Sequence, residues 1–169
     1  ATQCPNRVAT LTSISSAVGN PKTGLGSLRA ILAVAGTGDA SSPEALQAHF
    51  KTVLTALSGS KYRPTPEALD DAIRSAPRIG YDPVATRRQL IALLASGNRA
   101  KAVRQLRTPT LVIHGTEDPL LPFAAGEETA RLIRGAKLIP VEGLGHQLPP
   151  SLMGTYAKWI AEECHAHPA

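Results

Sequence analysis

Two side chains that could carry out acid–base chemistry together are Asp118 and His146. Asp118 belongs to the polar turn at residues 114–119, and His146 ends the glycine-rich turn at residues 142–146. A carboxylate that accepts the Nδ1 proton of an imidazole holds the ring in the tautomer that can take a proton from a hydroxyl. We therefore expect this pair to supply two of the three groups of a nucleophilic triad, and the third should be a serine.

Each of the two turns follows a run of residues typical of a buried parallel strand. Thr110 to Ile113 is apolar and β-branched, and Lys137 to Val141 leads to the second turn. Phe123 to Ile133, which lies between them, has apolar residues at helical spacing. A right-handed crossover places the carboxyl ends of both strands at one edge of the sheet. The pattern therefore predicts that Asp118 and His146 emerge side by side.

These two turns resemble the acid loop and the histidine loop of the α/β-hydrolase superfamily. The phrase H-G-x-x-D-x-x-x-P at residues 114–122 matches the acid loop, and G-x-G-H at residues 143–146 matches the histidine loop. In that family the nucleophile comes first in the chain, in a G-x-S-x-G turn. No G-x-S-x-G turn occurs in the 169 residues. The resemblance implies that the serine and the oxyanion donors come from elsewhere.

The front of the sequence supports the same interpretation. Cys4 to Leu11 looks like the segment that follows the nucleophile helix in such hydrolases, and Arg7 to Ile14 is the first predicted strand. The chain thus resembles the C-terminal portion of an α/β-hydrolase fold, a mostly parallel sheet with an inserted helical cap. We expect a core strand over residues 1–18, a helical cap over 19–107 and a core with both loops over 108–169. The partner would be the N-terminal half of the same hydrolase, as a second chain that carries the serine nucleophile.

The cap region should be built from helices. Leu25 to Ala35 is apolar, and Arg99 to Leu106 leads back to the sheet. Three further helices, each starting where an N-cap residue precedes a proline, are predicted near 43–57, 66–75 and 83–95. By the resemblance, apolar side chains of this region line a substrate pocket, and their alternative role is core packing: Leu28, Leu32, Phe50, Leu54 and Tyr81.

Other polar residues are rivals for the catalytic roles. Glu117 and Glu142 are alternative acids, but Asp118 holds the acid position of the motif, and Glu117 could point into solvent. His114 is an alternative base that we expect to be packed, and His49 should be structural. The serines that follow the first strand lack a glycine-flanked turn, so we expect pocket-lining or capping roles for them: Ser13, Ser15 and Ser16.

Composition excludes several classes of function. The net charge of +5 is spread along the chain and aromatic residues make up 4%, so we expect no nucleic-acid binding. Cys4 and Cys164 lie near opposite ends and should be free thiols, and the histidines of the tail, His165 and His167, are weak evidence for a metal. We expect no metal, no cofactor, no membrane span and a cytoplasmic location.

The phrases over residues 81–83, 90–98 and 143–149 look most like esterases similar to aclacinomycin methylesterase. That resemblance implies hydrolysis of a small carboxylic ester through an acyl-enzyme on a serine. Two alternatives remain open. One is another chemistry of the superfamily (dehalogenase, haloperoxidase, epoxide hydrolase or acyltransferase), because the residues that separate these activities are not in this sequence. The other is a non-catalytic module that binds a ligand or a protein.

Overall fold

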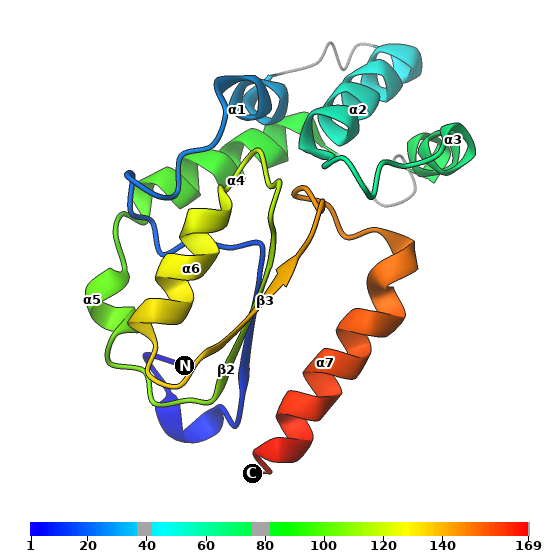
Figure 1. Cartoon of the computed structure of the whole chain (residues 1–169). Coiled ribbons are helices and arrows are strands. Elements are labelled where there is room, and N and C mark those ends of the chain that lie inside the picture. The colour runs from blue at the N-terminus through cyan, green and yellow to red at the C-terminus, as the bar shows by residue number, and fades with distance from the viewer. Residues whose placement is uncertain (37–41, 76–81, 169) are drawn as a thin grey trace.

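The computed structural model describes residues 1–36, 42–75 and 82–168 (Figure 1). A three-stranded sheet forms the centre, and helices cover both of its faces and its upper edge. The elements in chain order are η1 (Pro5–Arg7), β1 (Leu11–Ile14), α1 (Leu28–Ala35), α2 (Pro43–Leu57), α3 (Pro66–Ser75), α4 (Pro83–Ala95), α5 (Ala100–Val103), β2 (Thr110–Gly115), α6 (Phe123–Leu132), β3 (Lys137–Val141), η2 (Pro150–Leu152) and α7 (Met153–Ala166).

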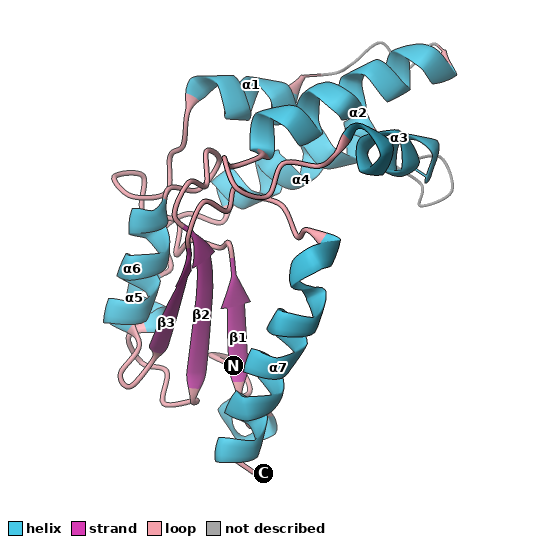
Figure 2. Cartoon of the chain, turned by 45° about the vertical axis from the view of Figure 1, so that its right-hand side comes forward, coloured by secondary structure: helices cyan, strands magenta, loops and turns pink. Residues whose placement is uncertain are grey.

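All three strands are parallel, in the order β1-β2-β3, so their carboxyl ends meet at one edge (Figure 2). Ser13 lies opposite Val112, and Ile113 lies opposite Ile139. Every residue of the central strand β2 is buried, as expected for a parallel strand covered on both faces. The predicted strand-helix-strand unit is therefore present, with α6 as its crossover.

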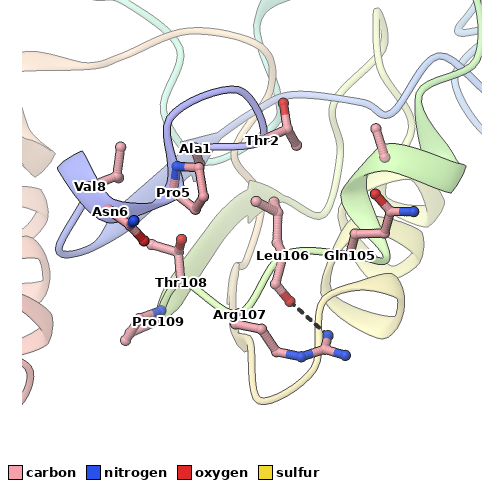
Figure 3. A pocket seen from close by; sticks show the side chains of 11 residues that line it. Ala1, Thr2, Pro5, Asn6, Val8, Gln105, Leu106, Arg107, Thr108 and Pro109 are labelled. Carbon is pink, nitrogen blue, oxygen red and sulfur yellow. Dashed lines mark hydrogen bonds between the residues drawn. The ribbon is translucent and has the colours of Figure 1, made fainter.

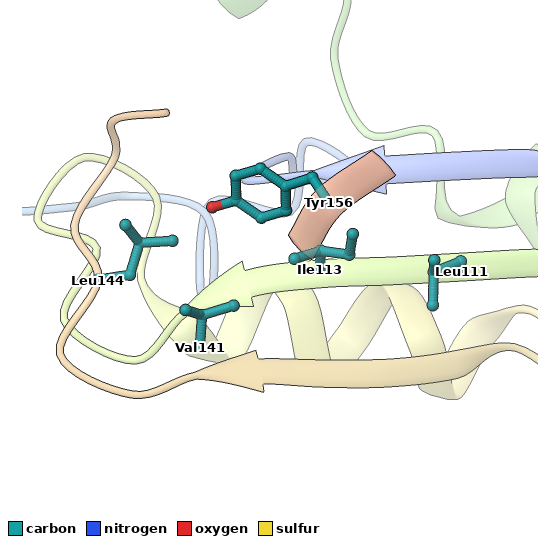
Figure 4. Packing of buried hydrophobic residues seen from close by; sticks show 5 residues of the cluster. All are labelled: Leu111, Ile113, Val141, Leu144 and Tyr156. Atoms are coloured by element: carbon teal, nitrogen blue, oxygen red, sulfur yellow. The ribbon is translucent and has the colours of Figure 1, made fainter. Parts of the chain in front are cut away.

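The two faces of β2 pack against different helices. Alternate side chains of a strand point to opposite faces. Leu111 and Ile113 pack on one face with Tyr156 of α7 and with Val141 and Leu144 (Figure 4). On the other face, His114 contacts α6. The last turn of β2 is thus held from both sides, and the loop that follows it starts from a fixed point.

The four helices α1 to α4 lie beyond the carboxyl ends of the strands (Figures 1 and 2). Their starts follow from local sequence. Ser42 Oγ, Thr65 Oγ1 and Asp82 Oδ1 accept hydrogen bonds from backbone N–H groups two or three residues ahead, and a proline follows each of them. Because this signal is local, the bounds predicted for α2, α3 and α4 are confirmed.

Three predicted elements differ from the structure by three residues or more at one end. The strand expected over Arg7 to Ile14 is shorter: residues 5–7 form a 3-10 turn, and the ladder begins where Leu11 N donates to Pro109 O at 2.9 Å. Helix α1 begins at Leu28 rather than Leu25, because Ser27 Oγ caps it by accepting from Ala30 N. Helix α5 extends over four residues only, against the eight expected.

Within the described ranges, every helix is too short or too polar to cross a membrane. Cys4 and Cys164 are both free thiols and both exposed, as their distance in the sequence predicts.

Candidate active site

Asp118 and His146 form the centre of the candidate site. His146 Nδ1 donates to Asp118 Oδ2 at 2.8 Å, and the other carboxylate oxygen, Oδ1, accepts from the backbone N–H groups of Leu120 and Leu121 at 2.9 and 2.8 Å. The Asp118 side chain is 0% exposed, whereas that of His146 is 22% exposed. The buried carboxylate therefore fixes the tautomer and the orientation of the ring. Nε2 makes no hydrogen bond to any described residue and remains available to a hydroxyl.

Backbone hydrogen bonds join the acid loop (residues 116–122) to the histidine loop (residues 142–146). Thr116 N donates to Val141 O at 3.1 Å, and Glu117 N donates to Leu144 O at 3.0 Å. In return, Gly143 N donates to the side-chain hydroxyl of Thr116 at 3.0 Å. The relative position of Asp118 and His146 is therefore set by backbone bonds and not by their own contact alone.

Two glycines of the histidine loop are needed for its shape. Gly143 has φ of +70°, in the left-handed region that other residues rarely adopt. Gly145 approaches the end of α2 so closely that a Cβ there would lie 2.2 Å from Leu57 O and 2.4 Å from Gly59 N. The sequence pattern G-x-G-H thus reflects a loop packed tightly between other backbone segments.

The segment between α2 and α3, residues 58–65, is called here the connector. Together with the end of α2, it is bonded to both loops. Leu57 O accepts from His146 N at 2.8 Å, and Lys61 N donates to Gly143 O at 3.1 Å. Ser60 donates to Glu117 through its backbone N–H and its hydroxyl, at 2.6 and 2.7 Å. The helical region therefore supports the loops that hold the candidate catalytic pair.

Glu117 is exposed but does not simply point into solvent, as the sequence suggested it could. Its carboxylate is bound to Ser60, and the Ser60 hydroxyl, followed by the Ser60 backbone N–H, lowers its pKa from the ordinary value. Sequence reasoning missed this role of Ser60. No local signal could have revealed it, because the two residues are 57 positions apart.

His114, the rival base, is a packed residue. Its side chain is 0% exposed, and Nε2 lies 2.8 Å from Leu121 O and 3.5 Å from Asp118 Oδ2. Because a carbonyl oxygen only accepts, Nε2 must carry a proton. Nδ1 is buried and has no hydrogen-bond partner among the described residues. His114 therefore supports the acid loop through its contact with Leu121 O. The side-chain donor closest to Asp118 is Nδ1 of His146.

The residues predicted to line a substrate pocket have different positions. Leu28 and Leu32 lie one turn apart on α1 and are 69% and 59% exposed. Phe50 and Leu54 are half-buried on α2, and Leu54 lines a cavity of about 520 Å³ beside the histidine loop. Tyr81 lies outside the described residues. Of the four residues of this set that are described, Leu54 is thus placed at a cavity that adjoins the site.

Among the serines after β1, Ser15 has an unusual backbone. Its φ is 43°, and its hydroxyl is buried with no hydrogen-bond partner in the described part of the chain. None of the hydrogen bonds between described residues joins Ser13, Ser15 or Ser16 to His146. The geometry therefore assigns none of these serines to the catalytic pair.

A second cavity, of about 640 Å³, lies at the opposite end of the sheet (Figure 3). It is bordered by η1 and by Leu106, Arg107 and Thr108, which precede β2. The six residues of β2 separate it from the acid loop by about 20 Å at 3.3 Å per residue. This cavity is therefore not part of the candidate site.

Comparison with known proteins places these features in context. The model of an abhydrolase family described as TAP-like protein matches residues 92–165, which include both loops. A bifunctional esterase/perhydrolase of Acinetobacter calcoaceticus is 32% identical over 59 residues, which cover 34% of this chain and 21% of that protein.

Solved structures match over nearly the whole chain. A meta-cleavage product hydrolase from Pseudomonas fluorescens IP01 has a TM-score of 0.73 at 17% identity, covering 98% of this chain and 58% of its own. A 2-hydroxy-6-oxo-6-phenylhexa-2,4-dienoate hydrolase from Rhodococcus sp. has a TM-score of 0.69 at 16% identity, covering 97% and 58%. The chain thus spans less than two thirds of the length of these proteins. At such identities the likeness establishes the fold.

Proposed function

Because the chain belongs to the α/β-hydrolase superfamily, we propose that it is the acid- and histidine-bearing part of a carboxylic ester hydrolase. Asp118 orients His146, and His146 activates a serine that residues outside this sequence supply. We propose that this serine lies on the N-terminal half of the same hydrolase, present as a second chain. In this arrangement α1 to α4 form the cap over the active site.

One observation carries the proposal: His146 Nδ1 is bonded to a fully buried carboxylate while Nε2 stays open. In the reaction, Nε2 would take the proton of the serine hydroxyl as its oxygen attacks the ester carbonyl. The same proton would then pass to the leaving alcohol, and a water molecule activated in the same way would release the acid. The buried Asp118 would stabilise the imidazolium that forms in each step.

The unpaired edge of β1 is an argument for a partner strand. Leu11 N and Ser15 N donate to Pro109 O and Ile113 O on the β2 side. By the alternation of a strand, Thr12 and Ile14 turn their backbone N–H and C=O groups away from β2, toward the side of β1 on which the described sheet has no further strand. A parallel strand there would satisfy these groups and would end beside the acid and histidine loops. We expect the interface between the two chains to bury more than roughly 1,600 Å² of surface, because it would cut one domain core in two.

The test is ester turnover by the chain together with the polypeptide that carries the serine. Intact-mass measurement of the purified material would identify that polypeptide, and p-nitrophenyl acetate would report activity. We expect His146→Ala and Asp118→Asn each to lower kcat/KM by about 10³- to 10⁴-fold. Glu142→Gln, an exposed residue in the same loop, is the matched control and should keep full activity. An active enzyme that tolerates His146→Ala would contradict the triad, and a stable, cooperatively unfolding monomer would contradict the partner strand.

A second candidate function is a non-catalytic binding module, favoured by the cavity of about 520 Å³ and by the lack of a G-x-S-x-G turn in the sequence. A fluorophosphonate probe separates the two. Labelling of a serine on a co-purifying chain supports the hydrolase. Ligand binding without any labelling, and unchanged in the double variant Asp118→Asn with His146→Ala, supports the module.

A further inference from the structure

The cavity of about 520 Å³ beside the histidine loop, called here the Gln147 cavity, has a distinct chemical character. Its walls come from the end of α2, the connector, α3 and residues 147–151, and most of the lining is apolar, including Leu54, Ala72 and Leu148. Gln147 directly follows His146 in the chain. A ligand held in this cavity would therefore lie next to the backbone that carries the imidazole.

Gln147 has a side-chain acceptor, Oε1, to which no described residue donates a hydrogen bond. Its Nε2 donates to Tyr62 O at 2.6 Å, which fixes the orientation of the amide. Its Oε1 is buried and has no hydrogen-bond partner in the described part of the chain. Leaving a buried acceptor unsatisfied is unfavourable, so the site favours a ligand that brings an N–H or O–H group to this oxygen.

Two charged residues line the cavity, Lys61 and Arg63, and both carry a positive charge. Neither makes a salt bridge within the described ranges. Lys61 Nζ lies 5.8 Å from the centre of the Tyr62 ring. Glu117 attracts Arg63 weakly from a distance, but both of its oxygens are already bonded to Ser60. Neither cation is therefore held in an ion pair by a described residue, although the Glu117 carboxylate lies near enough to act on Arg63, and both can pair with a carboxylate of a ligand.

We propose that the Gln147 cavity binds the substrate, and that the substrate is an ester with an apolar body, a carboxylate and a hydrogen-bond donor. The carboxylate pairs with Lys61 and Arg63, the apolar body contacts Leu54 and Leu148, and the donor binds Gln147 Oε1. This substrate class rests on the proposed hydrolase function. It adds a recognition element that the catalytic pair does not contain.

The test uses a small probe with all three features, N-benzoylglycine, titrated into the chain as it is purified and followed by amide NMR shifts. We expect shifts at residues 61–63 and at Gln147, Leu148 and Ser151. The neutral N-benzoylglycinamide lacks the carboxylate and should bind about fivefold to tenfold more weakly. The double variant Lys61→Met with Arg63→Met should abolish this preference. Lys51→Met with Arg88→Met, at exposed residues that do not line the cavity, should retain it.

A second comparison isolates Gln147. In 3-benzoylpropionate a methylene group replaces the N–H of the probe, so wild type should bind it more weakly than N-benzoylglycine, and Gln147→Leu should bind the two alike. Equal binding of the charged and neutral probes, an unchanged preference in the Lys61 and Arg63 double variant, or shifts confined to other residues would overturn the proposal. Because binding needs no turnover, a chain that binds as expected but supports no ester hydrolysis contradicts the proposed function and not this site.

Discussion

The carboxylate of Glu117 accepts hydrogen bonds from Ser60 at both of its oxygens, at 2.6 Å from the backbone N–H and at 2.7 Å from the hydroxyl. This contact joins the acid loop to the connector. The connector in turn reaches the histidine loop through Lys61 N and lines the Gln147 cavity. One short segment therefore supports the catalytic pair and forms part of the proposed substrate site.

Substitution Ser60→Ala tests that support. It removes the hydroxyl but leaves the backbone N–H, so the connector should open more often without global unfolding. We expect hydrogen exchange at residues 58–62 and 143–146 to become at least about threefold faster. Ser16→Ala, at an exposed serine far from the connector in the sequence, is the control and should not change these rates. If the exchange rates of Ser60→Ala were unchanged, the backbone hydrogen bonds would be enough to hold the connector without the Ser60 hydroxyl.

Gly126 on α6 is expected to tolerate no side chain. A Cβ there would lie 2.7 Å from Cβ, Cγ and Nδ1 of the buried His114, so Gly126→Ala should force α6 away from β2. We expect a loss of about 1–3 kcal/mol in the free energy of unfolding, measured by urea denaturation. Gly154→Ala on α7 meets no atom within 4 Å and should instead gain up to about 1 kcal/mol from helix propensity. Equal effects of the two substitutions would contradict the close packing at His114.

Glu128 on α6 should make stability depend on pH. Its buried carboxylate accepts hydrogen bonds from the Thr23 hydroxyl and from Asn20 Nδ2, and these bonds, led by that of Thr23, hold its pKa below the ordinary value of 4.5. A depressed folded-state pKa stabilises the fold above the unfolded-state value, and this stability is lost as pH falls through the folded-state value. We expect Glu128→Gln to be less stable than wild type at pH 7, with a difference that shrinks below pH 4.5.

Denaturation curves across this pH range would measure the Glu128 effect. Glu127→Gln, at an exposed neighbour on the same helix, is the matched control and should follow the wild-type curve. If the deficit of Glu128→Gln were constant down to low pH, the ionised carboxylate would not be the source of the stability.

Tyr156 carries a buried hydroxyl that has no hydrogen-bond partner among the described residues, and burial raises its pKa above 10.0. Tyr156→Phe keeps the ring, whose centre lies 5.9 Å from that of Trp159 in an edge contact, and removes the unsatisfied group. The free energy of unfolding should therefore stay equal or rise by up to about 1 kcal/mol. Tyr156→Leu, which loses the aromatic contact, should be destabilised. A clear loss in Tyr156→Phe would mean that the hydroxyl is bonded in solution.

Local signals in the sequence predicted much of this structure. The N-cap residue and proline at each start located α2, α3 and α4, because capping involves residues two or three positions apart. The strand-helix-strand pattern around α6 predicted that Asp118 and His146 would meet, because parallel strands with a crossover helix share one carboxyl edge. The start of β1 was predicted at Arg7 but lies at Leu11, since apolar composition does not show where pairing with β2 begins.

The sequence by itself determined the chemistry of the candidate pair and the order of the elements that carry it. Only the tertiary structure decided what surrounds the pair. Ser60 binds Glu117 across 57 positions, and Gln147 binds Tyr62 across 85. Such contacts depend on how the connector packs against the two loops, and this packing needs glycine at position 145 because Leu57 O leaves no room for a Cβ. Periodicity and motif spacing describe one segment at a time, so they carry no information about contacts between segments brought together by folding.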